Sequence, residues 1–188
     1  MIKYHTDRLI LREWLDQDIE PYVELNQDPE VLKYFPRLYT REESTEDIRE
    51  FNQLLKDYGY TIYACELKRT NEFIGFVGLY NRDDLPFSPC VEIGWRLAKR
   101  YWGNGYATEA AKKCLEIGFI DCNLEEIVSF TPKVNKPSER VMQKIGMCHK
   151  PSDDFFHYKV SKDHPLASHV LYRLSVIQYK SLYHRQNA

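Results

Sequence analysis

The sequence lacks an apolar segment long enough to cross a bilayer, and it lacks an excess of positive charge. No apolar run approaches the roughly 20 residues that a membrane-spanning helix needs, and MIKYHTDRLILREW at the start has no small-residue cleavage site. The formal net charge is -2, which is no reason to expect binding to nucleic acid or to a membrane. We therefore expect a cytoplasmic protein whose attraction for any anion is local.

Paired cysteines and clustered metal ligands are also lacking. The cysteines are odd in number and widely spaced, without a C-x-x-C pair: Cys65, Cys90, Cys114, Cys122 and Cys148. His157, His164 and His169 follow one another without a recognised metal-site spacing. We expect reduced, mostly buried thiols and no metal. The histidines are expected to structure a surface loop, with a place in an acceptor site as the alternative.

What the chain does contain is typical of one globular domain. It has 188 residues, of which 43% are hydrophobic and 29% charged, so it is long enough to bury a core. Repeats, low-complexity runs and interdomain linkers are absent from the sequence. We expect a single domain over residues 1–178 and a C-terminal tail over residues 179–188.

Apolar periodicity changes between strand and helix spacing along the chain. Helices are expected from Asp16 or Asp18 and over 45–58, 107–119 and 137–145, and strands over 8–14, 60–68, 72–81, 90–98, 125–133 and 169–179. Gly59 and Gly146 follow two of these helices as stop signals. The order predicts a mixed α/β fold in which hairpins precede a β-α-β-α-β tail.

The stretch RYWGNGYAT joins an expected strand to an expected helix whose first turns bury only small residues. Glycines before a helix N-terminus let the backbone approach an anion, and Arg100 adds a positive charge. The chain lacks a Walker sequence, and Thr108 stands where a dinucleotide fingerprint needs its third glycine or alanine. From the residues alone, this stretch is either an anion cradle or a plain turn.

The same stretch resembles a motif of a known family. RYWGNGYATEA fits the R/Q-x-x-G-x-G/A acyl-CoA loop of the Gcn5-related N-acetyltransferases (GNAT), and VNKPSERVMQKIGM follows in that family's order and spacing. The stretch TDRLILREWLDQDIEPYVELNQDPEVLKYFP resembles the entry segment of the family, and DHPLASHVLYRLS resembles the close of its branch of ribosomal-protein N-terminal alanine acetyltransferases (RimJ/RimL-like). The resemblance covers about residues 6–177.

The resemblance implies a fold and a set of cofactor contacts. The fold is a twisted mixed sheet of about six or seven strands with about four flanking helices, in which parallel strands over 91–97 and 126–131 splay apart around acetyl-CoA. Trp95 and Leu97 lie on the strand that faces the pantetheine arm. The pyrophosphate contacts, mostly backbone N–H groups, are implied at Arg100, Gly103, Asn104, Gly105, Tyr106, Ala107 and Thr108. Asn135 and Ser138 match the second CoA motif, although Ser138 could instead cap its helix.

Glu92 is the candidate general base for attack of a neutral amine on the thioester. Odd-numbered apolar residues over 91–97 form one face of the strand, so Glu92 points from the other face. The alternative is a salt bridge or a strand end near solvent. Many family members carry a tyrosine as general acid where this chain has Met142, which cannot donate a proton. Ser138 is then the better donor to the thiolate.

The sequence does not identify the acceptor. The resemblance implies an N-acetyltransferase for a primary amine, such as a protein N-terminal α-amine. The alternatives are a small amine of the polyamine or aminoglycoside type, or a module that binds acyl-CoA without turnover. Segments that cover the acceptor site in relatives hold Trp14, Tyr34, Phe35 and Tyr39 here, and core packing is their alternative role.

Three further expectations concern partners. Lys133, Lys136 and Arg140 are too few to indicate RNA binding, but they are candidates for contact with the CoA 3′-phosphate. We expect a monomer or a homodimer. Acetyl-CoA and an amine acceptor are the expected ligands, without nucleic acid or membrane.

Overall fold

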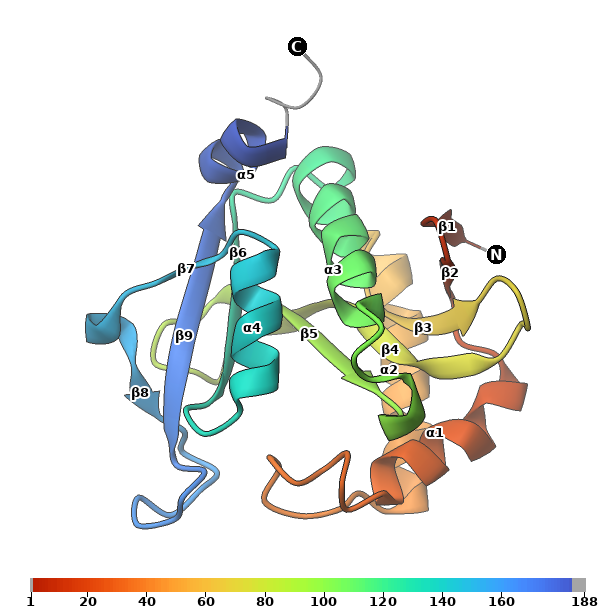
Figure 1. Ribbon diagram of the computed structural model, residues 1–188, viewed down its shortest axis with the longest axis horizontal. Helices are drawn as coiled ribbons and strands as arrows, with labels where there is room; N and C mark the ends of the chain where they lie inside the picture. The colour runs from red at the N-terminus through yellow and green to blue at the C-terminus, as the bar shows by residue number, and fades with distance from the viewer. Residues whose placement is uncertain (1, 184–188) are drawn as a thin grey trace.

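The computed structural model describes residues 2–183, which form a mixed α/β fold around one sheet (Figure 1). The described strands are β1 (Lys3–His5), β2 (Leu9–Arg12), β3 (Ile62–Leu67), β4 (Phe73–Arg82), β5 (Cys90–Leu97), β6 (Glu126–Pro132), β7 (Cys148–His149), β8 (Phe155–Phe156) and β9 (Ser168–Ser175). Their order in the sheet is β1-β2-β3-β4-β5-β6-β9-β7, and β8 also pairs with β9. The predicted fold class is confirmed, and the short strands β1, β7 and β8 make the sheet larger than expected.

Five α-helices cover the sheet and its edge within the described chain: α1 (Ile19–Gln27), α2 (Arg41–Tyr58), α3 (Tyr106–Glu116), α4 (Lys136–Lys144) and α5 (Val176–Tyr183). One buried cluster joins α1 and α2 to the sheet through Trp14, Tyr22, Phe51 and Phe76. A larger cluster includes Ala110, Ala111 and Leu115 of α3 together with sheet residues such as Ile93. The sheet therefore separates two layers of apolar packing.

Helix α2 begins four residues before the predicted position because a capping box stabilises its N-terminus. The Thr40 side chain accepts a hydrogen bond from the Glu43 N–H, and the Glu43 carboxylate accepts one from the Thr40 N–H. This reciprocal arrangement satisfies two backbone donors that an uncapped helix would leave free. Gly59 ends the helix at φ 77°, in the left-handed conformation that glycine adopts readily.

Helix α3 packs on the sheet with mostly small buried side chains. Ala110, Ala111 and Cys114 are fully buried. The predicted helix over 107–119 ends as an α-helix at Glu116 and continues as a π turn over Ile117–Asp121. A Cβ added to Gly118 in that turn would lie 2.7 Å from Ile127 Cδ1 and 3.0 Å from Leu79 Cδ1, so any larger residue would have to displace these side chains.

The end of the chain corrects the strand predicted over 169–179. Strand β9 ends at Ser175, and α5 follows immediately. The Gln178 N–H donates to Ser175 Oγ, and Gln178 Oε1 accepts from the Ser175 N–H, which is a capping box in the sequence SVIQ. Tyr179 is buried beside Phe119, with ring centroids 4.9 Å apart. The boundary predicted at residue 178 therefore falls inside a packed helix, and residues 184–188 lie outside the described part.

None of the helices described within residues 2–183 is both long and apolar enough to cross a membrane. The cysteines are free thiols; Cys65 and Cys114 are buried, whereas Cys148 is exposed.

Candidate active site

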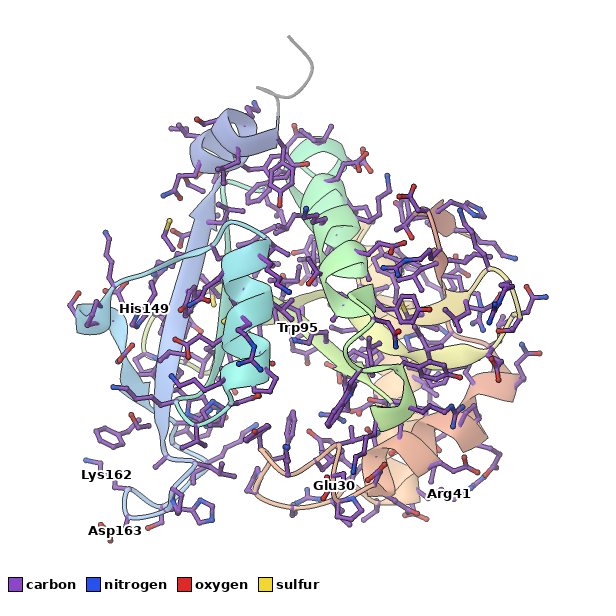
Figure 2. The ribbon with its side chains drawn as sticks, in the orientation of Figure 1. Glu30, Arg41, Trp95, His149, Lys162 and Asp163 are labelled. Atoms are coloured by element: carbon purple, nitrogen blue, oxygen red, sulfur yellow. The ribbon has the colours of Figure 1, made fainter. Side chains whose placement is uncertain are left out.

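The sheet opens between β5 and β6, which are its parallel neighbours. Over the described residues these strands are registered at one position, Glu92 opposite Val128. Beyond it, Ser129 Oγ on β6 donates to the Ile93 carbonyl at 2.9 Å, so a side chain replaces the backbone ladder. Helix α3 follows β5 and α4 follows β6, and Trp95 lies between these two helices (Figure 2). A cavity of about 970 Å³ occupies this opening.

The glycine loop forms one rim of the cavity. Gly103 and Gly105 have φ values of 79° and 81°, which glycine alone adopts without strain. A Cβ at Gly103 would meet nothing within 4 Å. Gly105 is the N-cap of α3 and makes no side-chain cap bond there, so the first N–H groups of this helix are available to a ligand.

Arg8 supports the loop from outside the cavity, a role that the sequence did not reveal. Its Nη1 donates to the Asn104 carbonyl at 3.0 Å, and its Nε donates to Glu109 Oε2 at 2.6 Å. The guanidinium also lies 4.6 Å from the centre of the Tyr106 ring. Arg8 therefore joins β2 to the loop and to the first turn of α3.

The cofactor residues predicted on the loop divide into two groups. Gly103, Gly105, Tyr106, Ala107 and Thr108 line the cavity, as do Trp95 and Leu97 on β5. The Asn104 side chain instead donates to the carbonyls of Tyr101 and Trp102. The Arg100 guanidinium lies over the Tyr101 ring and borders a separate hollow with Arg12 and Glu72.

Arg100 is not among the residues that line the cavity, so a contact between its side chain and CoA stays a prediction. The 3₁₀ turn over Lys99–Tyr101 buries Tyr101 and turns Arg100 away from the cavity. The charge that the sequence placed beside the glycines is thus directed to the other side of the loop. Backbone N–H groups remain as the donors that the loop offers.

Asn135 and Ser138 both line the cavity at the start of α4. Asn135 Oδ1 accepts from the Ser138 N–H at 3.4 Å, and its Nδ2 donates to Thr131 Oγ1 at 2.8 Å. Asn135 is thus the N-cap, which corrects the alternative in which Ser138 caps the helix. Ser138 Oγ accepts from Trp95 Nε1 at 3.1 Å, so its own proton is free to be donated elsewhere. Met142 is buried and also lines the cavity.

Glu92 projects into the cavity from the face of β5 that also carries Arg96. Burial raises the pKa of its carboxyl group to about 7, opposed by the charge of Arg82 and reinforced by that of Asp84. Arg82 Nη1 is 3.4 Å from Glu92 Oε2, while the same guanidinium makes two 2.9 Å hydrogen bonds to Asp84. Asp84 accepts the two shorter hydrogen bonds from Arg82, so Arg82 stabilises the ionised Glu92 only weakly. Glu92 can therefore exchange a proton near neutral pH.

The aromatic residues predicted around the acceptor divide between core and cavity. Trp14 is a core residue whose Nε1 donates to the Ile62 carbonyl at 2.8 Å. Tyr34, Phe35 and Tyr39 line the cavity from the segment between α1 and α2. This segment therefore forms a wall of the site, as the resemblance implies.

Two of the three histidines form the opposite wall. His157 and His169 line the cavity, with ring centroids 5.0 Å apart. Burial lowers the pKa of His157 to about 4, with nearby His169 and Arg82 acting in the same direction, and burial also lowers the pKa of His169. These lowered pKa values favour the neutral form of both rings. His164 lies apart, where its Nδ1 accepts from the Leu166 N–H.

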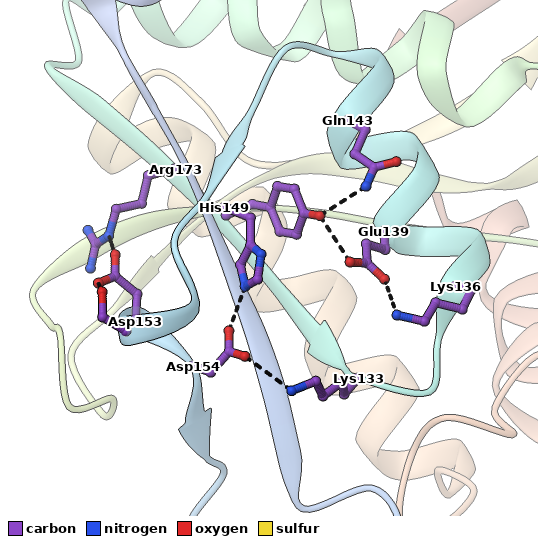
Figure 3. Close-up of polar contacts among 10 residues, drawn as sticks. Lys133, Lys136, Glu139, Gln143, His149, Asp153, Asp154 and Arg173 are labelled. Atoms are coloured by element: carbon purple, nitrogen blue, oxygen red, sulfur yellow. Dashed lines mark hydrogen bonds and ion pairs between the residues drawn. The ribbon is translucent and has the colours of Figure 1, made fainter.

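A polar network on the outer side of α4 fixes the position of that helix (Figure 3). Tyr172 Oη donates to Glu139 Oε1 at 3.0 Å and accepts from Gln143 Nε2 at 3.1 Å. The His149 ring stacks on Tyr172 and bonds Asp154 at 2.7 Å. These contacts tie α4 to β9 and β7.

The same network bears on the residues predicted for the CoA 3′-phosphate. Lys136 pairs with Glu139 at 2.6 Å, and Lys133 pairs with Asp154 at 3.5 Å. Arg140, in contrast, lines the cavity. Of the three predicted cations, Arg140 is thus the one that faces the opening.

The comparisons with known proteins agree on one family. The family model described as the acetyltransferase (GNAT) domain matches residues 8–148. An uncharacterised Bacillus subtilis protein, YkkB, is 36% identical over 77% of this chain and 84% of its own length. The uncharacterised N-acetyltransferase YnaD of the same organism is 34% identical over 76% of this chain and 80% of its own length.

Solved structures show the same fold. A GNAT-family acetyltransferase from Bacillus anthracis superposes with a TM-score of 0.77 at 25% identity, covering 94% of this chain and 99% of that one. The ribosomal-protein-S5-alanine acetyltransferase of Vibrio fischeri superposes with the same TM-score of 0.77 at 17% identity, covering 96% of this chain and 100% of that one. At that identity, the second likeness concerns the fold alone.

Proposed function

The chain belongs to the acetyltransferase (GNAT) family, and from this premise we propose that it transfers the acetyl group of acetyl-CoA to a primary amine by direct attack in a ternary complex. The observation that carries the proposal is the opening between β5 and β6, with the glycine loop at one end and Glu92 beside the registered pair. The members of this family are acyltransferases, so the remaining questions are how the residues act and which amine they accept.

The residues present fit an acyl-CoA donor. The rim at Gly103 and Gly105 has no side chain to obstruct a pyrophosphate, and the N-terminus of α3 directs uncapped N–H groups toward it. Trp95 and Leu97 lie along the path of the pantetheine arm, and Asn135 stands across the opening on α4. Arg140, which lines the cavity, is the candidate contact for the 3′-phosphate.

The reaction requires few groups, and the cavity holds a candidate for each. Glu92 accepts the proton of the attacking ammonium, directly or through water, leaving the neutral amine to attack the thioester carbonyl. Because the Ile93 carbonyl faces β6, the N–H groups of Ile93 and Trp95 face the same gap. An N–H in this gap stabilises the oxyanion. As the C–S bond breaks, the Ser138 hydroxyl donates a hydrogen bond to the leaving thiolate, and the second proton lost by the nitrogen neutralises that thiolate to give the CoA thiol.

Two kinds of acceptor are compatible with this chemistry. A protein N-terminal α-amine is supported by the fold shared with a ribosomal-protein alanine acetyltransferase. A small amine of the polyamine or aminoglycoside type is the alternative. Met142, in place of the tyrosine usual in the family, is the observation that favours a third possibility, a module that binds acyl-CoA without turnover.

A screen of amines and peptides separates these possibilities. Purified protein and acetyl-CoA are incubated with each candidate, and release of the CoA thiol is measured against a reaction without amine. We expect release with a defined group of amines. Binding of acetyl-CoA without release for any amine or peptide would instead support the non-catalytic module.

A further inference from the structure

Arg96 stands out among the cavity residues because it is a buried cation that forms no direct ion pair with any described residue. It lies on β5 and is 8% exposed. Its Nη1 donates to Asn26 Oδ1, while its Nε is buried without a hydrogen-bond partner among the described residues. Rings of Phe35, Tyr39 and Phe76 surround the guanidinium at 4.4, 4.9 and 5.2 Å.

The rings do not complete the environment of this cation. Aromatic faces stabilise the charge, but the N–H groups of a guanidinium point outward in its plane and need acceptors there. Asn26 accepts a hydrogen bond from Nη1 of Arg96, whereas the Nε–H has no acceptor among the described residues. A buried polar group left in that state is costly unless a ligand supplies the missing partner.

Of the other cations that line the cavity, Lys33, Arg140 and Lys144 are exposed, and the remaining three are paired. Arg37 bonds Glu43, Arg82 bonds Asp84, and Lys159 lies 3.8 Å from Asp84. Asp47 also lines the cavity and accepts from the Tyr22 hydroxyl at 2.9 Å. Burial raises the pKa of Asp47 and the charge of Arg96 opposes that rise, but Asp47 and Arg96 make no direct ion pair among the described residues. Within residues 2–183, Arg96 forms no ion pair shorter than 4 Å. Arg96 is therefore a deeply placed positive charge of the cavity whose Nε–H has no acceptor among the described residues, while Asp47 interacts with it only through space.

The distance between Arg96 and Glu92 restricts the shape of the acceptor. Both project from the same face of β5 with Gly94 between them, and four residues of strand span about 13 Å. A Cβ at Gly94 would have Glu92 Oε1 as its nearest neighbour, at 3.8 Å. The floor between the carboxylate and the guanidinium is thus bare, and an elongated molecule can lie along it.

We propose that Arg96 binds a carboxylate of the acceptor, so that the acceptor is an elongated primary amine carrying an acidic group at its far end. The amine lies near Glu92 and the carboxylate near Arg96. This inference rests on the proposed acetyl transfer and narrows its substrate class. The acid can belong to an ω-amino acid or to an acidic residue near a protein N-terminus, and both present the same chemistry to Arg96.

Matched pairs of acceptors test the inference. One arm compares 6-aminohexanoate and 8-aminooctanoate with their amides, and the other compares the C-terminally amidated peptides Ala-Gly-Glu and Ala-Gly-Gln. For at least one pair we expect kcat/KM to be roughly tenfold or more higher for the acid, since a charge-assisted bond replaces a neutral one. The arm with the larger ratio identifies the source of the acid. Equal values for acid and amide in both arms would overturn the inference while leaving acetyl transfer intact.

Variants assign the preference to Arg96. R96Q should reduce the acid-to-amide ratio to near one, and R96K should leave an intermediate ratio because it keeps the charge without the planar fork. R49Q removes the same charge from an exposed residue of α2 and should leave the ratio unchanged. A ratio that survives in folded R96Q would exclude Arg96 as the carboxylate site.

A second measurement does not depend on turnover. With CoA present, the midpoint of thermal unfolding should rise with the preferred acid and not with its amide in the wild type, and with neither in R96Q. An equal response to acid and amide overturns the inference. Failure of the proposed function appears differently, as absence of thiol release with every amine despite these binding effects.

Discussion

At the scale of single residues, the chemistry of the cavity depends on how deeply each charged group lies. Burial raises the pKa of Glu92 to about 7, whereas the carboxylate of Asp84 has its pKa lowered because Tyr158 and Arg82 outweigh its partial burial. Two carboxylates on neighbouring elements thus have different tasks. Glu92 can exchange a proton near neutral pH, and Asp84 remains ionised and holds Arg82.

The first prediction concerns the pH dependence of catalysis. As a base, Glu92 must be deprotonated, so kcat/KM should rise with pH through about 7 and then level off as the acceptor amine also becomes neutral. E92Q should lower kcat/KM by about 10²–10⁴-fold and remove the rise near pH 7. E46Q, an exposed change on α2, is the matched control. Full activity of E92Q from about pH 6 to about pH 9 would exclude the role.

The second prediction concerns stability at the same residue. The folded-state pKa of Glu92 lies above the ordinary value of 4.5, so the unfolded chain loses the proton first as pH rises. Wild-type stability should therefore fall between about pH 4.5 and pH 7, and E92Q should escape this loss. At about pH 8, E92Q should be more stable by up to about 3 kcal/mol. Urea unfolding at about pH 4 and pH 8 measures the difference, and an equal effect at both would contradict it.

At the scale of elements, the glycine loop and α3 act as one unit. The loop is bare where it faces the cavity, and the Trp102 indole and the Asn104 amide hold its shape through backbone carbonyls. Arg8 joins it to β2. The loop can therefore present N–H groups in a fixed arrangement, which lowers the ordering cost of binding a phosphate.

The third prediction separates strain from function in this loop. G103V places a branched side chain at φ 79°, where there is space but an unfavourable backbone conformation. The variant can relieve about 1–2 kcal/mol of strain by moving the loop out of its binding conformation. Restoring that conformation on binding would cost the same free energy, so the affinity for acetyl-CoA should fall by roughly tenfold or more. G59V imposes the same strain at φ 77°, outside the residues that line the cavity.

Calorimetric titration with acetyl-CoA distinguishes the two variants. We expect G59V to be destabilised with unchanged affinity, and G103V to lose affinity. If both variants bind acetyl-CoA as the wild type does, the loop is a plain turn.

At the scale of the whole molecule, the site exists because the sheet is two parts joined at one seam. Strands β1 to β5 form one antiparallel part, and β6, β9, β7 and β8 form the other. They meet in parallel register at Glu92 and Val128 and through the Ser129 side chain. The seam opens toward α3 and α4, which stand on either side of it in Figure 1.

The fourth prediction tests the seam. Ser129 is buried, and S129A would leave the Ile93 carbonyl without this 2.9 Å hydrogen bond. We expect a loss of about 1–3 kcal/mol in the free energy of unfolding, together with a higher KM for acetyl-CoA because the gap widens. S152A, which removes a hydroxyl from an exposed turn, should change neither quantity. Unchanged unfolding in S129A would show that the seam does not depend on this bond.

Much of the site could be predicted from the sequence because it rests on local patterns. The two glycines before α3 need only their own backbone conformation, and the small stripe of Ala110 and Ala111 determines how closely that helix approaches the sheet. Alternation along β5 was enough to place Glu92 on the face opposite Trp95. Sequence order alone brought α4 to the end of β6, next to the loop.

The remainder was decided by contacts between distant segments. Arg100 adjoins the glycines in sequence, yet burial of Tyr101 turns it away from the cavity, while His157 and His169 reach the wall only because β8 pairs with β9. From the sequence, Arg96 is an ordinary charged residue of a strand. In the structure, the rings of Phe35 and Tyr39, from the segment between α1 and α2, pack against its guanidinium. Periodicity records which face a side chain takes, whereas its partners and its burial depend on which distant segment packs there, and only the tertiary structure determines that.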